Sequence, residues 1–583
     1  MPASRDHNQQ RRNGRRLMAA LLAASAMLLP MGGCGFSRWQ PENTEVASPA
    51  TAGLDVPAAM ETPVMANGPL GRYDPAIEIH FVRDVDEDMR DNILPNCPGE
   101  TFASNRWIRA FHDDLGIDVV YDWTTPTGDA YTQKLNVTLA SGDLPDVIGV
   151  DAAQLKQLSD ADLIEDLTDA WNTHASEALK GYYTLQGPGI LGASTFDGRL
   201  KGIVQAADAF GDGTFLWIRA DWLRSLGLSP PKTMDDVLAI SDAFTRRDPD
   251  GNGKDDTFGL AVVKDLYNPC MGLEGFFAGY HAYPYMWIED ASGGLVYGST
   301  LPEVRRTLQV LAGMYAAGQL EPEFGVLEIG NVAEAIEQGR IGMEFGAQWN
   351  PMYPLISSHR ADPKADWTGY PLVSADDGQV LSPCRFTASR FYAVRKGYPH
   401  PEALVKMMNL HAEKNWGADA DFNRYYMPQE NGSVGVWKFS PVYPAPPLKN
   451  LDAYREIVRA RAAGTTDRLT GEAQTIERNV KAYLGGDSSQ WGWERIYGAE
   501  GVYRWVDRYV QNNWLFREKF TGAPTGTMVE RRATLEKMER EAFIKIIMGV
   551  EPIEAFDRFV DDWNRLGGGQ ITREVNAWYN ETR

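Results

Sequence analysis

Alternating strand and helix patterns open the body of the chain. Residues 76–82 alternate apolar and polar side chains with the period of two that is typical of a strand. The predicted elements then follow in the order strand 76–82, helix 105–112, strand 117–123, helix 129–140 and strand 147–150. This βαβαβ order predicts parallel strands joined by right-handed crossovers, which is an α/β fold.

A second strand and helix pattern begins near residue 215. Residues 215–219 predict a strand, and 220–226 a short helix that Gly227 ends. Thr233 is followed by Asp236 three positions later, which is a capping-box pattern. The apolar residues after it fall on one helical face, so we expect a longer amphipathic helix there.

That helix leads into a loop with the oxygen spacing of an EF-hand calcium site. Side chains with oxygen atoms occupy positions 1, 3, 5 and 9, and Gly253 at position 6 permits the sharp turn. The predicted ligands are the side chains of Asp248, Asp250, Asn252 and Asp256 and the main-chain carbonyl of Lys254.

The loop also departs from the EF-hand pattern. Position 12 is Gly259 instead of a bidentate Glu, and the following residues predict a strand where an EF-hand has a helix. The loop is present once, which argues against a dockerin module. We expect a structural calcium ion, and the alternative is a metal-free turn.

The amino terminus has the organisation of a secretory signal. Four arginines within 11–16 precede an apolar run over 17–30, which is too short to remain as a membrane-spanning helix. Met31-Gly32-Gly33-Cys34 resembles a bacterial lipobox, in which the signal is removed and the cysteine is lipidated. We therefore expect residues 1–33 to be a lipoprotein signal and Cys34 to anchor the protein to the cell membrane from outside the cytoplasm.

The signal is followed by a tether and a large body. Residues 34–74 are rich in Pro, Ala, Thr, Gly and Glu and show little periodicity, so we expect a flexible segment. Residues 75–583 are long enough for two lobes with substantial cores, and they hold no second apolar run long enough to span a bilayer.

The net charge restricts the possible binding partners of the protein, and the cysteine count restricts its possible disulfides. The chain of 583 residues has a net charge of −22, and loss of five Arg and one Asp with residues 1–33 leaves −26. Nothing in the sequence resembles a basic groove, so we expect no nucleic-acid partner. Cys97, Cys270 and Cys384 remain after lipidation and allow at most one intrachain disulfide.

The ordered motifs of the body resemble the solute-binding lipoproteins of carbohydrate ABC importers. The similarity is greatest to the LipO-like branch, whose relatives include alginate-oligosaccharide-binding proteins. The matching segments are 140–148, 195–202, 217–228, 333–351, 520–525 and 563–578. The resemblance implies a two-lobed fold of the periplasmic-binding-protein type (type II), with a ligand cleft between the lobes and a calcium loop remote from it. It also implies an ABC permease as partner.

Aromatic content independently fits sugar capture. Aromatic residues make up 11% of the chain, and flat rings can cover the apolar face of a sugar while polar groups bind its hydroxyls. The candidate ligand contacts are Trp287, Trp349, Asn350, Arg385, Trp491 and Trp493. For each aromatic the alternative is packing in the core, and for Arg385 it is an ion pair within the protein.

The competing class is a secreted glycosidase or polysaccharide lyase. A glycosidase needs two carboxyl groups about 5–10 Å apart, and 79 acidic residues always allow some pair to be nominated. The sequence has no Gly-x-Ser-x-Gly elbow, His-Glu-x-x-His helix, Walker loop or Cys-x-x-Cys pair. We therefore expect a non-catalytic receptor that captures an oligosaccharide and delivers it to a permease by hinge closure.

Overall fold

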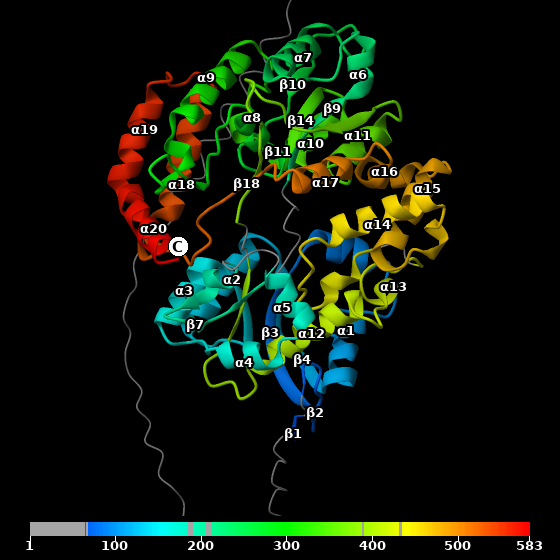
Figure 1. The fold of residues 1–583 in the computed structure, drawn as a ribbon, viewed down its shortest axis with the longest axis vertical. Helices are drawn as coiled ribbons and strands as arrows, with labels where there is room; N and C mark the ends of the chain where they lie inside the picture. Colours follow the sequence, from blue (N-terminus) through cyan, green and yellow to red (C-terminus); the bar gives the residue numbers. More distant parts are fainter. Residues whose placement is uncertain are drawn as a thin grey trace, which may run out of the picture. The chain divides into compact units, whose positions relative to one another are not determined.

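Two mixed sheets form the frame of the protein (Figure 1). In the first sheet, β3 (Ile77–Val85) lies between β4 (Ile117–Pro126) and β5 (Val147–Val150) and runs parallel to both. β17 (Phe391–Val394) pairs antiparallel with β5, and β8 (Ile203–Val204) forms the other edge. The predicted βαβαβ order with parallel strands is confirmed.

The second sheet has the order β10-β14-β9-β15. β14 (Ile341–Ala347) runs antiparallel to β9 (Thr214–Arg219) and parallel to β10 (Phe258–Leu260). β15 (Trp367–Tyr370) pairs with β9, and β11 (Cys270–Gly272) pairs with β14. The strands predicted over 215–219 and after the calcium-like loop are β9 and β10.

The structure is a computed structural model that describes residues 64–65, 68–184, 190–205, 213–386, 390–430 and 434–582, all within one compact unit, Glu61–Arg583. The predicted signal, Cys34 and the tether up to residue 63 lie outside the described residues. Lipidation therefore stays a prediction.

The chain passes between the two sheets three times. It leaves the first sheet after β8, returns with β17, and passes to the second half again between η6 (Val436–Phe439) and α14 (Lys449–Ala463). We call the described residues of 68–205 and 390–443 lobe 1, and those of 213–386 and 444–582 lobe 2. Two lobes are the architecture that the sequence and its family resemblance predicted.

Helices cover both sheets. Lobe 1 carries α1 (Arg106–Ala110), α2 (Asp129–Ser141), α3 (Ala152–Asp160), α4 (Thr168–His174), α5 (Glu177–Thr184), α12 (Glu402–Trp416) and α13 (Phe422–Tyr425). Over residues 213–381, lobe 2 carries α6 (Ala220–Ser225), α7 (Met234–Arg246), α8 (Glu274–Gly279), α9 (Pro302–Ala316), α10 (Ile329–Glu337) and α11 (Leu355–Ala361).

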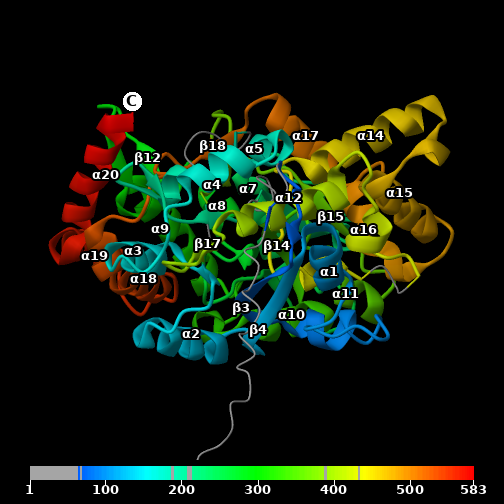
Figure 2. The same cartoon turned by 90° about the horizontal axis from the view of Figure 1, so that it is seen from below.

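The rest of lobe 2 is mostly helical. Its helices are α14, α15 (Gly471–Leu484), α16 (Trp491–Tyr497), α17 (Tyr503–Gln511), α18 (Gly526–Ile547), α19 (Ala555–Trp563) and α20 (Gly569–Thr582). Seen from below, α14 and α15 lie at the end opposite to α19 and α20 (Figure 2). The short strands β16 (Ser382–Cys384) and β18 (Leu515–Arg517) pair in parallel beside the second sheet.

The predicted helix starts and stops are present as cap contacts. The Thr233 hydroxyl and the Asp236 side chain form the expected capping box at the start of α7. Gly116 follows the helical segment that begins with α1, and its left-handed φ of 66° allows the chain to turn into β4. A Cβ at this position would approach the Tyr73 carbonyl oxygen to 2.3 Å, so both the conformation and the space require glycine.

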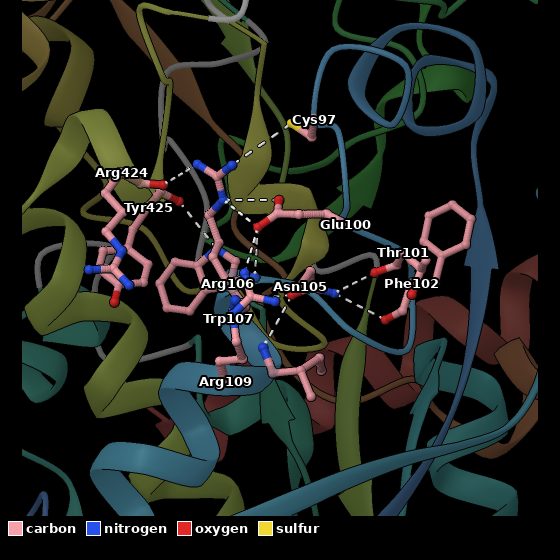
Figure 3. A network of polar contacts seen from close by, with 11 residues as sticks. Cys97, Glu100, Thr101, Phe102, Asn105, Arg106, Trp107, Arg109, Arg424 and Tyr425 are labelled. Atoms are coloured by element: carbon pink, nitrogen blue, oxygen red, sulfur yellow. Dashed lines mark hydrogen bonds and ion pairs between the residues drawn. The ribbon is translucent and has the colours of Figure 1, made fainter.

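A polar network ties α1 to α13, which is more than 300 residues away in sequence (Figure 3). The Asn105 side chain caps α1 by accepting the N–H groups of Trp107 and Ile108. Arg106 pairs with Glu100 at 3.1 Å, and its guanidinium also donates to the Arg424 carbonyl at 2.7 Å. The last segment of lobe 1 is therefore fixed to the first by hydrogen bonds as well as by packing.

Part of the segment expected to be a tether is folded. β1 (Val64–Met65) pairs with β2 (Tyr73–Asp74), and Tyr73 is fully buried with its hydroxyl donating to Glu402 at 2.6 Å. The Lys406 ammonium also donates to the Gly71 carbonyl at 2.8 Å. The folded body therefore begins before residue 75. None of the described helices is both long and apolar enough to cross a membrane.

Candidate functional site

A cavity of about 290 Å³ lies where side chains of both lobes meet. Lobe 1 contributes Ala152 at the start of α3, Ala193, and Phe391 at the start of β17. Lobe 2 contributes the remaining lining residues, which are Tyr285, Trp287, Tyr297, Arg385, Phe386, Glu518, Phe520, Gly522, Pro524, Met528, Arg532, Leu535, Glu536, Trp563 and Ile571. Aromatic rings and charged groups in one concave space are typical of a ligand site.

Packed aromatic rings form one wall of this cavity. Trp287 in β12 (Trp287–Glu289) pairs across the hairpin with Tyr297 in β13 (Leu295–Tyr297). Tyr297 stacks on Trp563 with ring centres 4.9 Å apart and planes at 5°. Trp287 is only 6% exposed, so the wall is rigid and presents a small part of each ring to the cavity.

Arg385 lies at the cavity just after β16. Its Nε is 2.9 Å from Oε1 of Glu274, and its Nη2 donates to the Tyr267 carbonyl at 3.1 Å. Its guanidinium also sits 5.6 Å from the centre of the Tyr285 ring. The guanidinium is thus held in place by the protein, as the ion-pair alternative predicted, and it still lines the cavity.

Glu518 brings a carboxylate to the same space. Its oxygens accept the backbone N–H of Trp287 at 3.3 Å and that of Phe386 at 3.0 Å. Burial raises the pKa of Glu518 to about 7, although these two N–H groups and the arginines Arg532 and Arg385 favour the ionised form. The group therefore changes charge near neutral pH.

α18 contributes a second charged pair. Arg532 donates to Glu536 one helical turn later at 2.5 Å, and its guanidinium lies 5.9 Å from the centre of the Tyr285 ring. Behind the wall, Glu539 on the same helix is buried and accepts hydroxyl donors at 2.6–3.0 Å, which come from Tyr267, Tyr297 and Ser299. Glu539 thereby fixes the lining residue Tyr297.

The structure brings two of the six candidate ligand residues into the cavity, Trp287 and Arg385. Trp349 and Asn350 follow the end of β14, where Ala347 pairs with Thr214 at the start of β9. Trp349 is half-buried against the third hydrophobic core, the cluster that also contains Trp217 and Trp367.

Asn350 is fully buried and does not line the cavity. Its side chain donates to Glu344 at 3.1 Å and lies 3.6 Å from the Cys270 thiol. Burial raises the pKa of Glu344 to about 8. The sequence-based assignment of Asn350 to ligand binding is therefore corrected, because its amide completes a buried polar cluster.

The sequence-based assignment of Trp491 to ligand binding is also corrected. The sequence places it in a glycine-rich loop, but it is the first residue of α16 and is 0% exposed. Its indole stacks on the His359 ring with centres 4.9 Å apart, which is the core-packing alternative. Gly492 allows α16 to pack closely against Pro351 and Met352, since a Cβ there would come within 2.7 Å of the Met352 sulfur. Trp493 stacks on Tyr497 instead of lining the cavity.

Sequence reasoning missed most of the cavity. Glu518, Phe520, Arg532, Glu536 and Trp563 come from the last 70 residues, far from the aromatic clusters that the sequence suggested. In the sequence, the segments 520–525 and 563–578 stand out only through their resemblance to the family. That resemblance was the one available signal for this part of the site.

The calcium-like loop is folded around the Asn252 side chain. The Asn252 amide nitrogen donates to Asp250 at 2.7 Å and to Asp256 at 3.1 Å. Asp248 accepts the backbone N–H groups of Asn252 and Gly253, both at 3.0 Å. In the described ranges, no group of three or more His, Cys, Asp or Glu side chains is arranged to hold a metal ion.

The fold and the cavity together define a two-lobed α/β binding protein. The chain belongs to the family described as bacterial extracellular solute-binding protein, whose model matches residues 105–414, more than half of the sequence.

Curated relatives match in sequence. Lipoprotein LipO of Bacillus subtilis (strain 168) is 28% identical over 267 residues, which are 45% of this chain and only half of LipO. The polygalacturonan/rhamnogalacturonan-binding protein YtcQ of the same organism is 28% identical over 472 residues, 77% of this chain and 83% of YtcQ. The fructooligosaccharide ABC transporter substrate-binding protein FusA of Streptococcus pneumoniae is 34% identical over 191 residues, 29% of this chain and 32% of FusA.

Solved structures share the fold. FusA of S. pneumoniae in complex with kestose has a TM-score of 0.58 at 14% identity, covering 87% of this chain and 99% of that one. The alginate-binding protein AlgQ2, solved without calcium ion, has the same TM-score and identity and covers 87% and 98%. At such identities the agreement confirms the two-lobed solute-binding fold.

Proposed function

We propose that this protein captures an extracellular saccharide in the cavity between its lobes and presents it to the permease of an ABC transporter. The observation that carries the proposal is the lining of the cavity, where Phe391 and two alanines of lobe 1 meet the aromatic rings and charged groups of lobe 2. The names of FusA and YtcQ, which describe saccharide-binding proteins, support it.

The lining residues match the chemistry of a sugar. The small exposed parts of Trp287 and Trp563 offer apolar surface to a sugar, and the more exposed Tyr285 ring, which Arg385 and Arg532 flank, offers a larger one. The Arg385 guanidinium supplies N–H donors and Glu518 supplies acceptor oxygens for the hydroxyl fringe. We assign Trp287 and Arg385 as ligand contacts.

Ligand binding is coupled to closure of the two lobes because the ligand shifts the equilibrium from the open to the closed form. A saccharide that touches Phe391 of lobe 1 and Trp287 of lobe 2 makes more contacts when the lobes are close together, so it stabilises the closed form. The permease then distinguishes the closed form from the open one.

Two accessory features complete the proposal. Cys34 carries a lipid that anchors the protein outside the cytoplasm. The loop at 248–256 holds a structural calcium ion through Asp248, Asp250, Asn252, Asp256 and the Lys254 carbonyl. Two observations support the ion: Asp250 and Asp256 converge on one amide group, and burial together with the nearby carboxylates of Asp248 and Asp256 raises the pKa of Asp250. A solved relative, FusA, is described with an EF-hand mutant.

A thermal-shift and calorimetry screen over plant and bacterial oligosaccharides tests the function. A ligand at 100 times its Kd adds about 2.7 kcal/mol to the free energy of unfolding. Trp287→Ala should lose the response, and Trp505→Ala, a partly buried tryptophan outside the cavity, should keep it. Failure of every oligosaccharide to bind would overturn the proposal.

The same screen separates a receptor from an enzyme. Glu518 and Glu536 both line the cavity, and a glycosidase uses two carboxyl groups. We expect the sugar to be recovered at its original length after long incubation, because the protein is a receptor. Shortened products that disappear in Glu518→Gln would instead establish hydrolysis.

A further inference from the structure

Each arginine of the cavity already has a carboxylate partner within the protein. Arg385 is paired with Glu274 at 2.9 Å, and Arg532 with Glu536 at 2.5 Å. On the nearby edge of lobe 1, Arg390 donates to Asp84 at 3.0 Å. Its side chain passes over Gly149, where a Cβ would lie 3.4 Å from the Arg390 Cδ, so it reaches across β5 to the end of β3.

Glu518 adds a carboxylate beyond these pairs. The two arginines of the cavity lining face Glu274, Glu518 and Glu536, so the described charges leave one negative charge in excess when Glu518 is ionised. Glu518 cannot easily turn away, because its two oxygens are held by the N–H groups of Trp287 and Phe386.

We infer that this cavity selects uncharged oligosaccharides and rejects those that carry a uronate in the part of the sugar that it encloses. The inference deepens the proposed function and rests on it. A ligand carboxylate would enter a space without surplus positive charge and would face Glu518 and Glu536. Such a repulsive element separates two ligands of equal shape even when the attractive contacts are the same.

This specificity differs from what the name of YtcQ states for that relative. Polygalacturonan is a polymer of uronates, and recognition of a carboxylate generally uses an arginine whose N–H donors are available to it in pairs. In the described part of this cavity, both arginines already face protein carboxylates. Charge in the lining, instead of overall sequence similarity, decides between neutral and acidic sugars.

The discrimination depends on pH through Glu518. The charged groups that face it are Arg385 from the connection after β16 and Arg532 and Glu536 from α18. Because its pKa is raised to about 7, its negative charge develops between pH 6 and 8. A uronate stays ionised throughout this interval, so its disadvantage grows as the pH rises.

Calorimetry with matched sugars at pH 6 and pH 8 tests the inference. The probes are xylotriose with and without a glucuronate substituent, methyl-esterified and free trigalacturonate, and neutral fructo- and galacto-oligosaccharides. We expect a neutral probe to bind at least tenfold more tightly than its uronate counterpart at pH 8, with a smaller ratio at pH 6. A uronate that binds as tightly as, or more tightly than, its neutral counterpart would overturn the inference and leave the proposed function standing. If no saccharide binds at all, the proposed function itself fails.

Three variants test which residues cause the preference for neutral sugars. Glu518→Gln should reduce the neutral-to-uronate ratio at pH 8 about tenfold and remove its pH dependence. Glu536→Gln, on the more exposed pair, removes one negative charge without touching the backbone contacts of Glu518, and should reduce the ratio in the same direction. Glu541→Gln, exposed on α18 outside the cavity, is the control and should change nothing. A ratio unchanged in both cavity variants would show that charge does not set the specificity.

Discussion

The carboxylate of Glu518 accepts the backbone N–H of Phe386 at 3.0 Å. Glu518 follows β18 in lobe 2, and the Phe386 ring packs against the core of lobe 1 that contains Ile79, Phe81 and Trp107. The same carboxylate lines the cavity. One side chain thus links the cavity to the residues that directly follow β16.

Trp491→Ala should destabilise the protein without weakening saccharide binding by its folded fraction. The indole is fully buried against His359, and removal of a buried tryptophan costs about 3–5 kcal/mol of folding free energy. Chemical denaturation and calorimetry on the same preparation check this. A large loss of affinity with an unchanged midpoint would instead place Trp491 in the ligand site.

Trp349 does not line the cavity, so Trp349→Ala tests whether a bound saccharide extends beyond the cavity to its half-buried ring. Loss of about 60–80 Å² of stacking contact, at roughly 25 cal/mol per Å², costs on the order of 1.5–2 kcal/mol of binding free energy, a ten- to thirtyfold rise in Kd. The matched control is Trp493→Ala, which removes another partly buried tryptophan that packs against the same core cluster. Equal affinity in wild type and Trp349→Ala would remove Trp349 from the ligand contacts.

Calcium removal should lower the melting temperature and leave saccharide affinity intact, because the loop residues do not line the cavity. Asp248→Ala combined with Asp250→Ala should reproduce the effect of a chelator. Asp255→Ala, an exposed acidic residue at a position of the loop that supplies no predicted ligand, serves as control.

Three results are possible in that experiment. A melting temperature that is insensitive to chelator would refute the calcium assignment. A shift that is the same for Asp255→Ala and for the double variant would point to general charge effects. Loss of affinity with an intact fold would place the ion near the sugar.

Cys34→Ser should leave the protein unprocessed or release it from membranes, because the Cys34 thiol is the proposed lipid acceptor. Membrane fractionation and the mobility of the processed form measure this. Cys384→Ser, in β16 of the folded body, should fractionate with membranes like the wild type. Normal processing and membrane association of Cys34→Ser would disprove the lipobox assignment.

Stability should fall as the pH rises from about 4.5 to about 7, in part because of Glu539. Burial raises the pKa of this carboxyl from 4.5 to about 7, so in that interval the folded protein binds more protons than the unfolded chain. Each pKa unit corresponds to 1.36 kcal/mol, so Glu539 contributes a decrease of up to about 3 kcal/mol, which is complete above pH 7.

Denaturation curves of Glu539→Gln against wild type isolate this contribution. The free energy of unfolding of this variant should change less between pH 5 and pH 7 than that of the wild type. Glu541→Gln, at an exposed position on the same helix, should follow the wild type. Parallel curves for wild type and Glu539→Gln would show that Glu539 titrates at its ordinary pKa.

Local sequence patterns were sufficient to predict many of the strands and helices. The strands β3, β4, β5 and β9 and the helices α2 and α7 lie where periodicity and capping residues predict them. The reason is that a strand or helix start depends on side chains within a few residues, such as Thr233 and Asp236. The family motifs along the body correctly indicated two lobes and a solute-binding protein.

The ligand residues could not be determined in this way. A tryptophan looks the same in sequence whether it lines a cavity, as Trp287 does, or packs in a core, as Trp491 does. The difference arises from which distant element packs against it: α11 supplies His359 to cover Trp491, whereas Trp287 stands beside Trp563 and Glu518 at the meeting of the two lobes. The sequence by itself determined much of the secondary structure, the lipobox-like motif and the calcium-like spacing, because these depend on neighbouring residues. The cavity was decided only by the tertiary structure, since its walls join residues from 152 to 571 through three passages of the chain between the sheets.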